Sequence, residues 1–162
     1  MGTRVIPDSD RLPTWLPLVG LVGLCLAVGF IGGQVTAESV RTWYPTLAKP
    51  SFQPPGAVFG PVWTVLYVLM AVSAWLVWRA SDGATLLPWW LQLALNAVWS
   101  PIFFGAQAPL PALFVIVALL AAIVWTIVRF AHHSKVAAWL LAPYLAWVSF
   151  ATVLNASIVA LN

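Results

Sequence analysis

Five long apolar runs constrain this 162-residue chain more than any other feature of its sequence. They are roughly Leu16–Thr36, Ala57–Ala80, Leu86–Ala106, Leu110–Phe130 and Val136–Leu161. Each holds about 20 residues or more, enough at ~1.5 Å rise per residue to cross a hydrocarbon layer ~30 Å thick. Because lipid offers no partner to backbone N–H and C=O groups, the runs should be helices. We therefore predict an all-α integral membrane protein, a bundle of five transmembrane helices forming one domain over residues 1–162.

The composition points the same way. Apolar residues make up 62% of the chain and charged residues 7%, whereas roughly a quarter of the residues in a soluble domain are charged. The net charge of +3 is thinly spread, so no nucleic-acid-binding surface is expected. The single cysteine, Cys25, excludes an intrachain disulfide and a cysteine-based metal cluster. The lipid bilayer is the environment that this composition fits.

Ionisable residues are missing from the places where conventional chemistry would need them. The four acidic residues lie outside the apolar runs or at their ends, and no Lys or Arg lies in the middle of a run. Ion-coupled transporters need intramembrane ionisable groups, so this class is disfavoured. His132 and His133 are neighbours in a short loop, and there is no Ser–His–Asp set, HExxH or CxxC pattern. We expect no metal site, no bound cofactor and no conventional catalytic centre.

The distribution of loop charges predicts the orientation of the chain. One side of the membrane would hold the N-terminus and two loops with five basic residues, namely Arg4, Arg11, Arg79, Arg129 and Lys135. The other side would hold two, Arg41 and Lys49. The positive-inside bias therefore puts the N-terminus in the cytoplasm and the C-terminus outside.

The connection between the first two runs, residues 37–56, is long and stiff. Its segment WYPTLAKPSFQPP, residues 43–55, contains Pro45, Pro50, Pro54 and Pro55, and each proline fixes its own φ and biases the preceding residue to extended geometry. Long connections that persist in compact folds are often lids or binding loops. We interpret residues 37–56 as a lid loop over one end of the bundle.

Apart from Trp43, which begins the WYPTLAKPSFQPP segment, the eleven tryptophans fall into two groups. Those near the ends of the runs are typical of residues that anchor a protein at the membrane interface; they are Trp15, Trp75, Trp78, Trp89, Trp90, Trp125 and Trp139. Trp63, Trp99 and Trp147 lie deeper in their runs. There the indole N–H needs a partner that lipid does not supply, so these side chains should pack against protein or line a cavity.

Two helical faces are consistent with such a cavity. In the third run one face carries polar and aromatic residues at spacings of four, four and three: Gln92, Asn96, Ser100 and Phe103. These either form interhelical hydrogen bonds or anchor a ligand, and spacing alone leaves both open. In the fifth run a second face suits either a flat apolar guest or ordinary core packing: Tyr144, Trp147, Ala151 and Asn155. Pro143 should kink this helix.

Three segments, in this order, carry a resemblance to a known family. They are WYPTLAKPSFQPPGAVFGPVWTVLY, LALNAVWSPIFFG and APYLAWVSFATVLN. The chain resembles bacterial-type members of the translocator protein family, formerly called peripheral-type benzodiazepine receptors or tryptophan-rich sensory proteins. The resemblance implies a five-helix bundle, commonly a homodimer, whose long first loop covers a cavity.

The resemblance also implies ligands. Family members bind porphyrins such as protoporphyrin IX, and several bind isoquinoline carboxamides and benzodiazepine-like drugs. Some bacterial members promote light-dependent oxidative breakdown of protoporphyrin IX. Animal members bind cholesterol through a Tyr and an Arg that end the fifth helix. Here the residues after Asn155 are ASIVALN, with neither, so cholesterol is not expected as a ligand.

Individual residues carry over from the family's motifs. Two tryptophans implicated in the photochemistry match Trp63 and Trp147. The other implied pocket residues are Tyr44, Pro54, Tyr67, Asn96, Ser100, Phe103 and Ala151, and the aromatic face of the fifth run adds Tyr144. Lys49 and Arg41 are the cations available for the porphyrin propionates. For a homodimer, the GxxxG pattern at Gly29–Gly33 is one candidate seam, and the third helix is the other.

Three functions follow as alternatives. The first is a membrane receptor or sensor that binds a tetrapyrrole, with or without light-dependent degradation of that ligand. The second is a passive carrier of tetrapyrroles or other lipophiles. The third is an interaction subunit whose cavity is only a packing defect.

Overall fold

The computed structural model describes residue 13 and residues 15–81 and 86–162, and every described element is helical. The long helices are α1 (Leu16–Thr42), α2 (Phe59–Ser81), α3 (Leu87–Ser100), α4 (Pro109–Ala131) and α6 (Ala142–Leu161). Shorter elements are the 3₁₀ turns η2 (Tyr44–Thr46) and η3 (Gly56–Val58), the π-helical turn η4 (Pro101–Gly105) and the helix α5 (Lys135–Leu140). Arg4 and Arg11, on which the predicted orientation partly rests, lie outside the described residues.

Prolines mark the beginnings of the helices. A proline occupies one of the first two positions of α1, α3, α4 and α6. This position costs little, because the N–H that proline lacks would have no intrahelical acceptor there. The irregularity expected at Pro143 is the junction between α5 and α6, where Leu141 makes a turn between the two helices. α5 ends at Leu140, and α6 begins at Ala142.

The helix boundaries differ from the apolar runs in two informative places. α1 continues to Thr42, six residues beyond the predicted run, because polar residues at a helix end do not stop a helix. The loop between α1 and α2 is correspondingly shorter than the predicted residues 37–56. The third run is divided, since Pro101 has no N–H to continue α3, and the chain makes the π-helical turn η4 instead.

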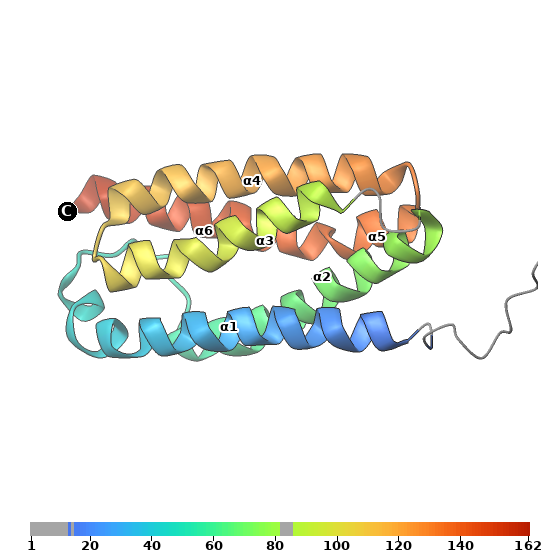
Figure 1. Ribbon diagram of the computed structural model, residues 1–162. Coiled ribbons are helices and arrows are strands. Elements are labelled where there is room, and N and C mark those ends of the chain that lie inside the picture. Colours follow the sequence, from blue (N-terminus) through green and yellow to red (C-terminus); the bar gives the residue numbers. More distant parts are fainter. Residues whose placement is uncertain (1–12, 14, 82–85) are drawn as a thin grey trace, which may run out of the picture.

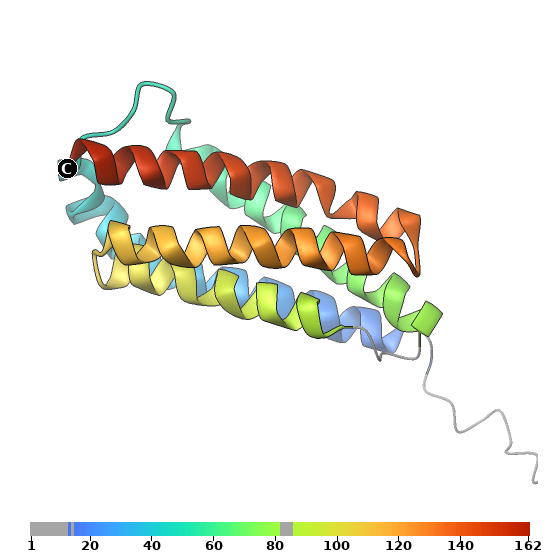
Figure 2. The same ribbon diagram turned by 90° about the horizontal axis from the view of Figure 1, so that it is seen from above.

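The helices form a ring in which neighbours are antiparallel except α1 and α3, which both run toward the same end of the bundle. α1 packs against α2 and α3, α4 packs against α3 and α6, and α5 closes the ring against α2. Figure 1 shows α3, α4 and α6 running side by side and α2 crossing obliquely toward α5. The loop after α1, the end of α3 and the C-terminus gather at one end of the bundle, as Figure 2 also shows.

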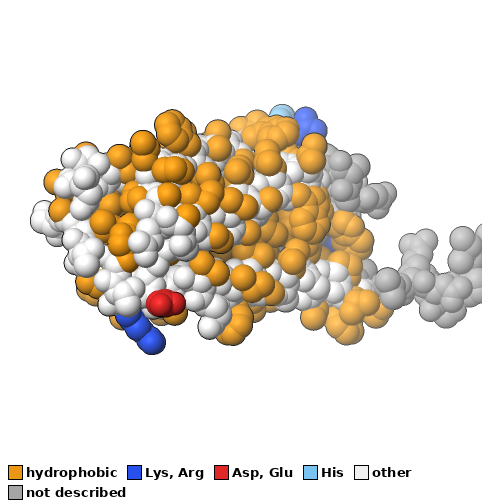
Figure 3. All heavy atoms as spheres, turned by 60° about the vertical axis from the view of Figure 1, so that its left-hand side comes forward, with side chains coloured by type: hydrophobic (Ala, Val, Ile, Leu, Met, Phe, Trp, Pro, Cys, Tyr) orange, Lys and Arg blue, Asp and Glu red, His pale blue; other side chains and the backbone are white. Residues whose placement is uncertain are grey.

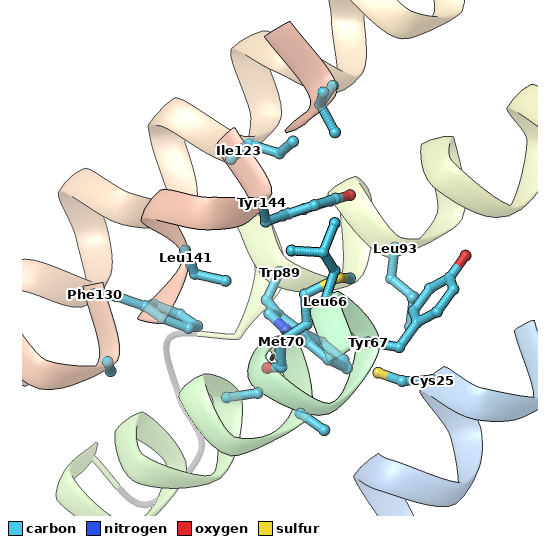
Figure 4. Packing of buried hydrophobic residues seen from close by; sticks show 14 of the residues in the cluster. Cys25, Leu66, Tyr67, Met70, Trp89, Leu93, Ile123, Phe130, Leu141 and Tyr144 are labelled. Carbon is cyan, nitrogen blue, oxygen red and sulfur yellow. Dashed lines mark hydrogen bonds between the residues drawn. The ribbon is translucent and has the colours of Figure 1, made fainter. Parts of the chain in front are cut away.

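The main core lies between α2, α3, α4 and the α5–α6 segment. Met70, Trp89 and Tyr144 are fully buried in it (Figure 4). Trp89 corrects an expectation, because we predicted that it anchors the chain at the membrane interface. Its indole Nε1–H instead donates to the carbonyl of Met70 at 3.1 Å, which gives this buried donor the partner it needs.

The outside of the bundle is apolar. Figure 3, in which the loop end is turned toward the viewer, shows hydrophobic side chains over most of the face and few charged ones. Four described segments are long and apolar enough to cross a membrane: Leu16–Thr42, Gly56–Ser81, Pro109–Ala131 and Lys135–Leu161. α3, at 14 residues, is shorter than these.

A neutral aromatic cavity

A cavity of about 550 Å³ lies at the loop end of the bundle, with walls from α1, α2, α3, η4, α4, α6 and the loop. Eight of the ten sequence-predicted binding residues line it: Tyr44, Trp63, Tyr67, Asn96, Ser100, Phe103, Trp147 and Ala151. The other two, Pro54 and Tyr144, do not belong to its lining. This volume lies within the ~300–1,000 Å³ range of small-molecule sites.

Nine of the lining residues carry aromatic rings, and they come from several helices and the loop. The ring centroid of Trp63 lies 5.6 Å from that of Tyr67 and 6.3 Å from that of Tyr144. Trp147 on α6 contacts Phe59 at the start of α2, with centroids 5.5 Å apart. On the opposite side, Trp99 and Phe103 stack with centroids 5.2 Å apart. Ala151, one turn after Trp147 on α6, also lines the cavity, and its small side chain leaves space that a larger residue would fill.

Asn96 joins three helices at the inner end of the cavity. The hydroxyl of Tyr67 donates to its Oδ1 at 2.9 Å, and its Nδ2 donates to the hydroxyl of Tyr144 at 2.8 Å. Tyr144 is fully buried behind this group, so it supports the wall rather than facing the cavity. Asn96 therefore makes the interhelical hydrogen bonds that one interpretation predicted and also lines the cavity. That it anchors a ligand stays a prediction.

The other two polar residues on this face of α3, Ser100 and Gln92, have different surroundings. Ser100 lines the cavity. Gln92, one turn before Asn96, is 1% exposed, and neither atom of its amide has a hydrogen-bond partner. Gln92 is therefore not the interhelical hydrogen-bond residue that the pattern allowed.

Glycines of α1 complete the wall, and sequence reasoning missed this contribution. A Cβ placed on Gly29 would lie 2.6 Å from Cε2 of Tyr67, and one on Gly32 would lie 3.7 Å from Oγ of Ser100. Gly29 thus lets α2 approach α1 closely. Gly29 therefore faces its own bundle, although it is one of the two glycines of the GxxxG pattern that is a candidate homodimer seam. The spacing of these small residues was the available signal, and it indicated close helix packing without saying which helix is the partner.

The loop closes the end of the cavity, and hydrogen bonds hold it in place. Tyr44 donates from its hydroxyl to Oε1 of Gln53 at 3.2 Å, and partial burial raises the pKa of the Tyr44 phenol above its usual value. The side chain of Asn162 accepts from Ala48 N–H and donates to Ala48 C=O, each at 3.0 Å. The loop is thus tied to the end of α6.

Lys49, one of the two cations expected near the porphyrin propionates, is bonded to the backbone of its own loop. Its Nζ donates to the carbonyls of Tyr44, Pro45 and Leu47 at 2.9, 3.2 and 2.8 Å. An ammonium group has three N–H donors, so these bonds use all of them. Lys49 holds the loop in shape, and a ligand carboxylate would have to displace a backbone carbonyl to reach it.

The indole N–H groups of Trp99 and Trp147 differ in whether they have a hydrogen-bond partner. Nε1 of Trp99 donates to Oδ1 of Asn155 at 3.2 Å, and Asn155 donates to the carbonyl of Pro109 at 2.9 Å. Nε1 of Trp147 is shielded from solvent but has no partner. No hydrogen bond therefore fixes this second ring.

The chemistry of the cavity is neutral. Its lining contains no Asp, Glu, Lys, Arg or His, and within the described part of the chain no cluster of three or more His, Cys, Asp or Glu could hold a metal ion. Apolar and aromatic walls with a few amides and hydroxyls are typical of sites for lipophilic molecules.

Comparison with known proteins agrees with these features. The model of the TspO/MBR family matches residues 21–161. The chain belongs to this family. Among similar members, "Tryptophan-rich protein TspO" of Archaeoglobus fulgidus is 45% identical over 91% of this chain and 97% of its own. The protein of the same name from Chlorobaculum tepidum is 46% identical over 91% and 96%. The human "Translocator protein" is 43% identical over 88% of each chain.

Family membership confirms the resemblance found in the sequence. Proteins of the TspO/MBR family are membrane proteins, and the apolar exterior and the four long apolar helices agree with that environment. The orientation of the N-terminus stays a prediction.

Proposed function

We propose that this TspO/MBR family member is a membrane receptor or sensor that binds porphyrins, with protoporphyrin IX as the reference ligand, in the cavity beneath the loop. The observation that carries the proposal is the convergence of Trp63, Tyr67 and Trp147 on one uncharged space of about 550 Å³. A porphyrin presents a wide apolar π-face to such walls. Aromatic contacts add ~0.5–1.5 kcal/mol each beyond the burial of apolar area. Other flat lipophiles, including isoquinoline carboxamides and benzodiazepine-like drugs, suit the same walls.

The position of the porphyrin propionates follows from the charges around the cavity. Because the lining is neutral and Lys49 is fully engaged, the propionates should point out of the cavity toward the headgroup region. Arg41, exposed near the end of α1, is the cation available on that side. The cavity then holds the macrocycle and leaves its charged edge in water.

Light-dependent degradation of the ligand is a second part of the proposal. A light-excited porphyrin can accept an electron from an electron-rich indole, and molecular oxygen would serve as the terminal oxidant. Trp63 and Trp147 both face the cavity and are the candidate donors. No side chain of the lining acts as a general acid or base in this scheme.

Passive carriage of a tetrapyrrole across the membrane is the alternative function. The same neutral lining favours it, because a cavity without ionisable groups offers no means of coupling to an ion gradient. Flux of the ligand between the two faces of reconstituted liposomes tests this alternative directly.

The test of porphyrin binding is a titration of the purified chain with protoporphyrin IX, followed by quenching of tryptophan fluorescence. Saturable quenching at micromolar ligand is expected. A linear response that free tryptophan reproduces would remove the proposal and leave the cavity as a packing defect.

A further inference from the structure

The cavity is not closed on all sides within the bundle. Five of its lining residues lie on one stripe of α1 and are also exposed on the outer surface: Leu26, Phe30, Gly33, Ala37 and Val40. Phe30 is the most exposed of the large ones, at 68%. Opposite them, Gly60 and Thr64 at the start of α2 likewise line the cavity and are exposed. The same residues thus border both the cavity and the exterior.

The geometry of α1 and α2 limits this opening. At Gly29 the two helices are in close contact, with the ring of Tyr67 filling the space that a Cβ would need. Gly33, one turn further along α1, and Gly60 on α2 have nothing within 4 Å of a Cβ position. The seam is therefore closed at Gly29 and Tyr67 and open between that contact and the loop.

We propose that the ligand of the cavity enters and leaves sideways, from the hydrocarbon phase of the bilayer, through this opening between α1 and α2. The opening, defined by Phe30, Gly33, Val40, Gly60 and Thr64, is called the α1–α2 mouth below. The proposal rests on the proposed function, because it concerns the route by which that ligand reaches the cavity.

Three observations favour this route over the loop. The rim of the mouth is apolar and belongs to helices long and apolar enough to span a bilayer, so a lipophile dissolved in lipid meets it directly. At its two glycines, Gly33 and Gly60, no neighbouring atom lies within 4 Å of a Cβ position, so no side chain is packed against the backbone there. The loop, in contrast, is held by the three bonds of Lys49 and by the pairing of Asn162 with Ala48, which would have to break for a ligand to pass.

A second lateral route has weaker support. An apolar groove lies on the outer surface between α2 and α6, lined in part by Val65, Ala146 and Phe150, and Trp147 separates it from the cavity. No hydrogen bond holds the Trp147 indole, but its ring fills the space and contacts Phe59 and Phe150. This route requires a side chain to swing out, whereas the α1–α2 mouth does not.

The experiment compares the rates of protoporphyrin IX binding and release in lipid vesicles that hold the full-length chain, with porphyrin fluorescence as the readout. Gly33→Trp and Gly60→Trp each place an indole in the mouth from opposite sides. Gly23→Trp is the matched control, because Gly23 is an exposed glycine of the same helix with open space at its Cβ and does not line the cavity. Ala146→Trp fills the α2–α6 groove.

We expect Gly33→Trp and Gly60→Trp to slow association and dissociation together by about tenfold, because an obstacle on one route raises the barrier for entry and for exit alike. Gly23→Trp and Ala146→Trp should keep the rates of the natural chain. Rates slowed only by Ala146→Trp would assign access to the α2–α6 seam and overturn the proposal. Equal rates in all four variants would overturn it in favour of the loop. If the natural chain binds no porphyrin, the proposed function itself fails. This result differs from the two outcomes above, which overturn only the route of entry.

Discussion

Gly29 on α1 and Tyr67 on α2 fit together so closely that the ring of Tyr67 occupies the place of a side chain on Gly29, with Cε2 2.6 Å from the position that a Cβ would take. This contact fixes the Tyr67 hydroxyl against Asn96 and closes part of the seam between α1 and α2. The inner wall of the cavity therefore depends on a residue that has no side chain.

Gly29→Ala should lower the free energy of unfolding by about 1–3 kcal/mol, because an added methyl in a packed site forces its neighbours apart. Gly33→Ala, on the same helix with open space around it, should be neutral or stabilise by up to ~1 kcal/mol through helix propensity. Denaturant unfolding in detergent, followed by circular dichroism, measures both. Equal effects of the two substitutions would show that the Tyr67 ring moves aside for the added methyl at no cost in stability.

Asn96→Leu should destabilise the bundle by about 2 kcal/mol, because it removes the hydrogen bonds that the buried hydroxyls of Tyr67 and Tyr144 make with the Asn96 amide. Combining it with Tyr144→Phe in a double-mutant cycle isolates the contribution of that one bond. If the two changes are additive, the bond contributes nothing to stability and Asn96 serves only the cavity.

Gln92→Leu, one turn away on the same face of α3, should have the opposite sign. Because its buried amide has no partner, an apolar side chain of similar size should leave the stability unchanged or raise it by about 1 kcal/mol. The same unfolding assay gives the result. A loss as large as that of Asn96→Leu would mean that an ordered water satisfies the amide.

Lys49→Met should loosen the loop rather than remove a ligand contact. Hydrogen exchange at the backbone amides of residues 44–49 should become faster, while the amides of α4 keep their protection. Binding of protoporphyrin IX and of its uncharged dimethyl ester should weaken by the same factor. Selective weakening for the free acid would instead identify Lys49 as a partner of the propionates.

Trp63→Phe and Trp147→Phe should each slow the bleaching of bound protoporphyrin IX in light severalfold, because phenylalanine keeps an apolar ring but is harder to oxidise. Trp139→Phe is the control, since Trp139 is 76% exposed and lies outside the cavity. Absorbance of the porphyrin during illumination is the measurement. The same bleaching rate in all the variants would exclude these two indoles as electron donors.

Much of this structure could be predicted from the sequence, and the reasons are physical. Apolar runs must be helical in lipid, so the helices follow from hydropathy, and Pro143 predicted the irregularity of the last run. Trp63 and Trp147 were accessible as lining residues because each carries a polar N–H too deep in its helix for an interfacial role, whereas Tyr44 and Tyr67 came from the family resemblance alone. Spacing on one helix was sufficient to group Asn96 with Ser100.

What the sequence did not show depends on partners in space. The place of Trp89 in the core required knowing that the carbonyl of Met70 lies 3.1 Å away. The engagement of Lys49 with loop carbonyls depends on how the four prolines fold the loop, which their separate φ preferences do not determine. The proposed α1–α2 mouth follows from the close contact at Gly29 and the open space at Gly33 and Gly60, and hydropathy encodes neither.

The central claim is that a flat lipophile occupies the space between Trp63 and Trp147, and filling this space tests it most directly. Ala151→Trp puts an indole into the cavity from α6, and Ala118→Trp puts one on the exposed face of α4. Protoporphyrin IX titrations, read by porphyrin fluorescence, should show an affinity loss of about tenfold or more for Ala151→Trp, since the indole takes the volume of the ligand, and none for Ala118→Trp. An unchanged affinity for a folded Ala151→Trp variant would contradict the account.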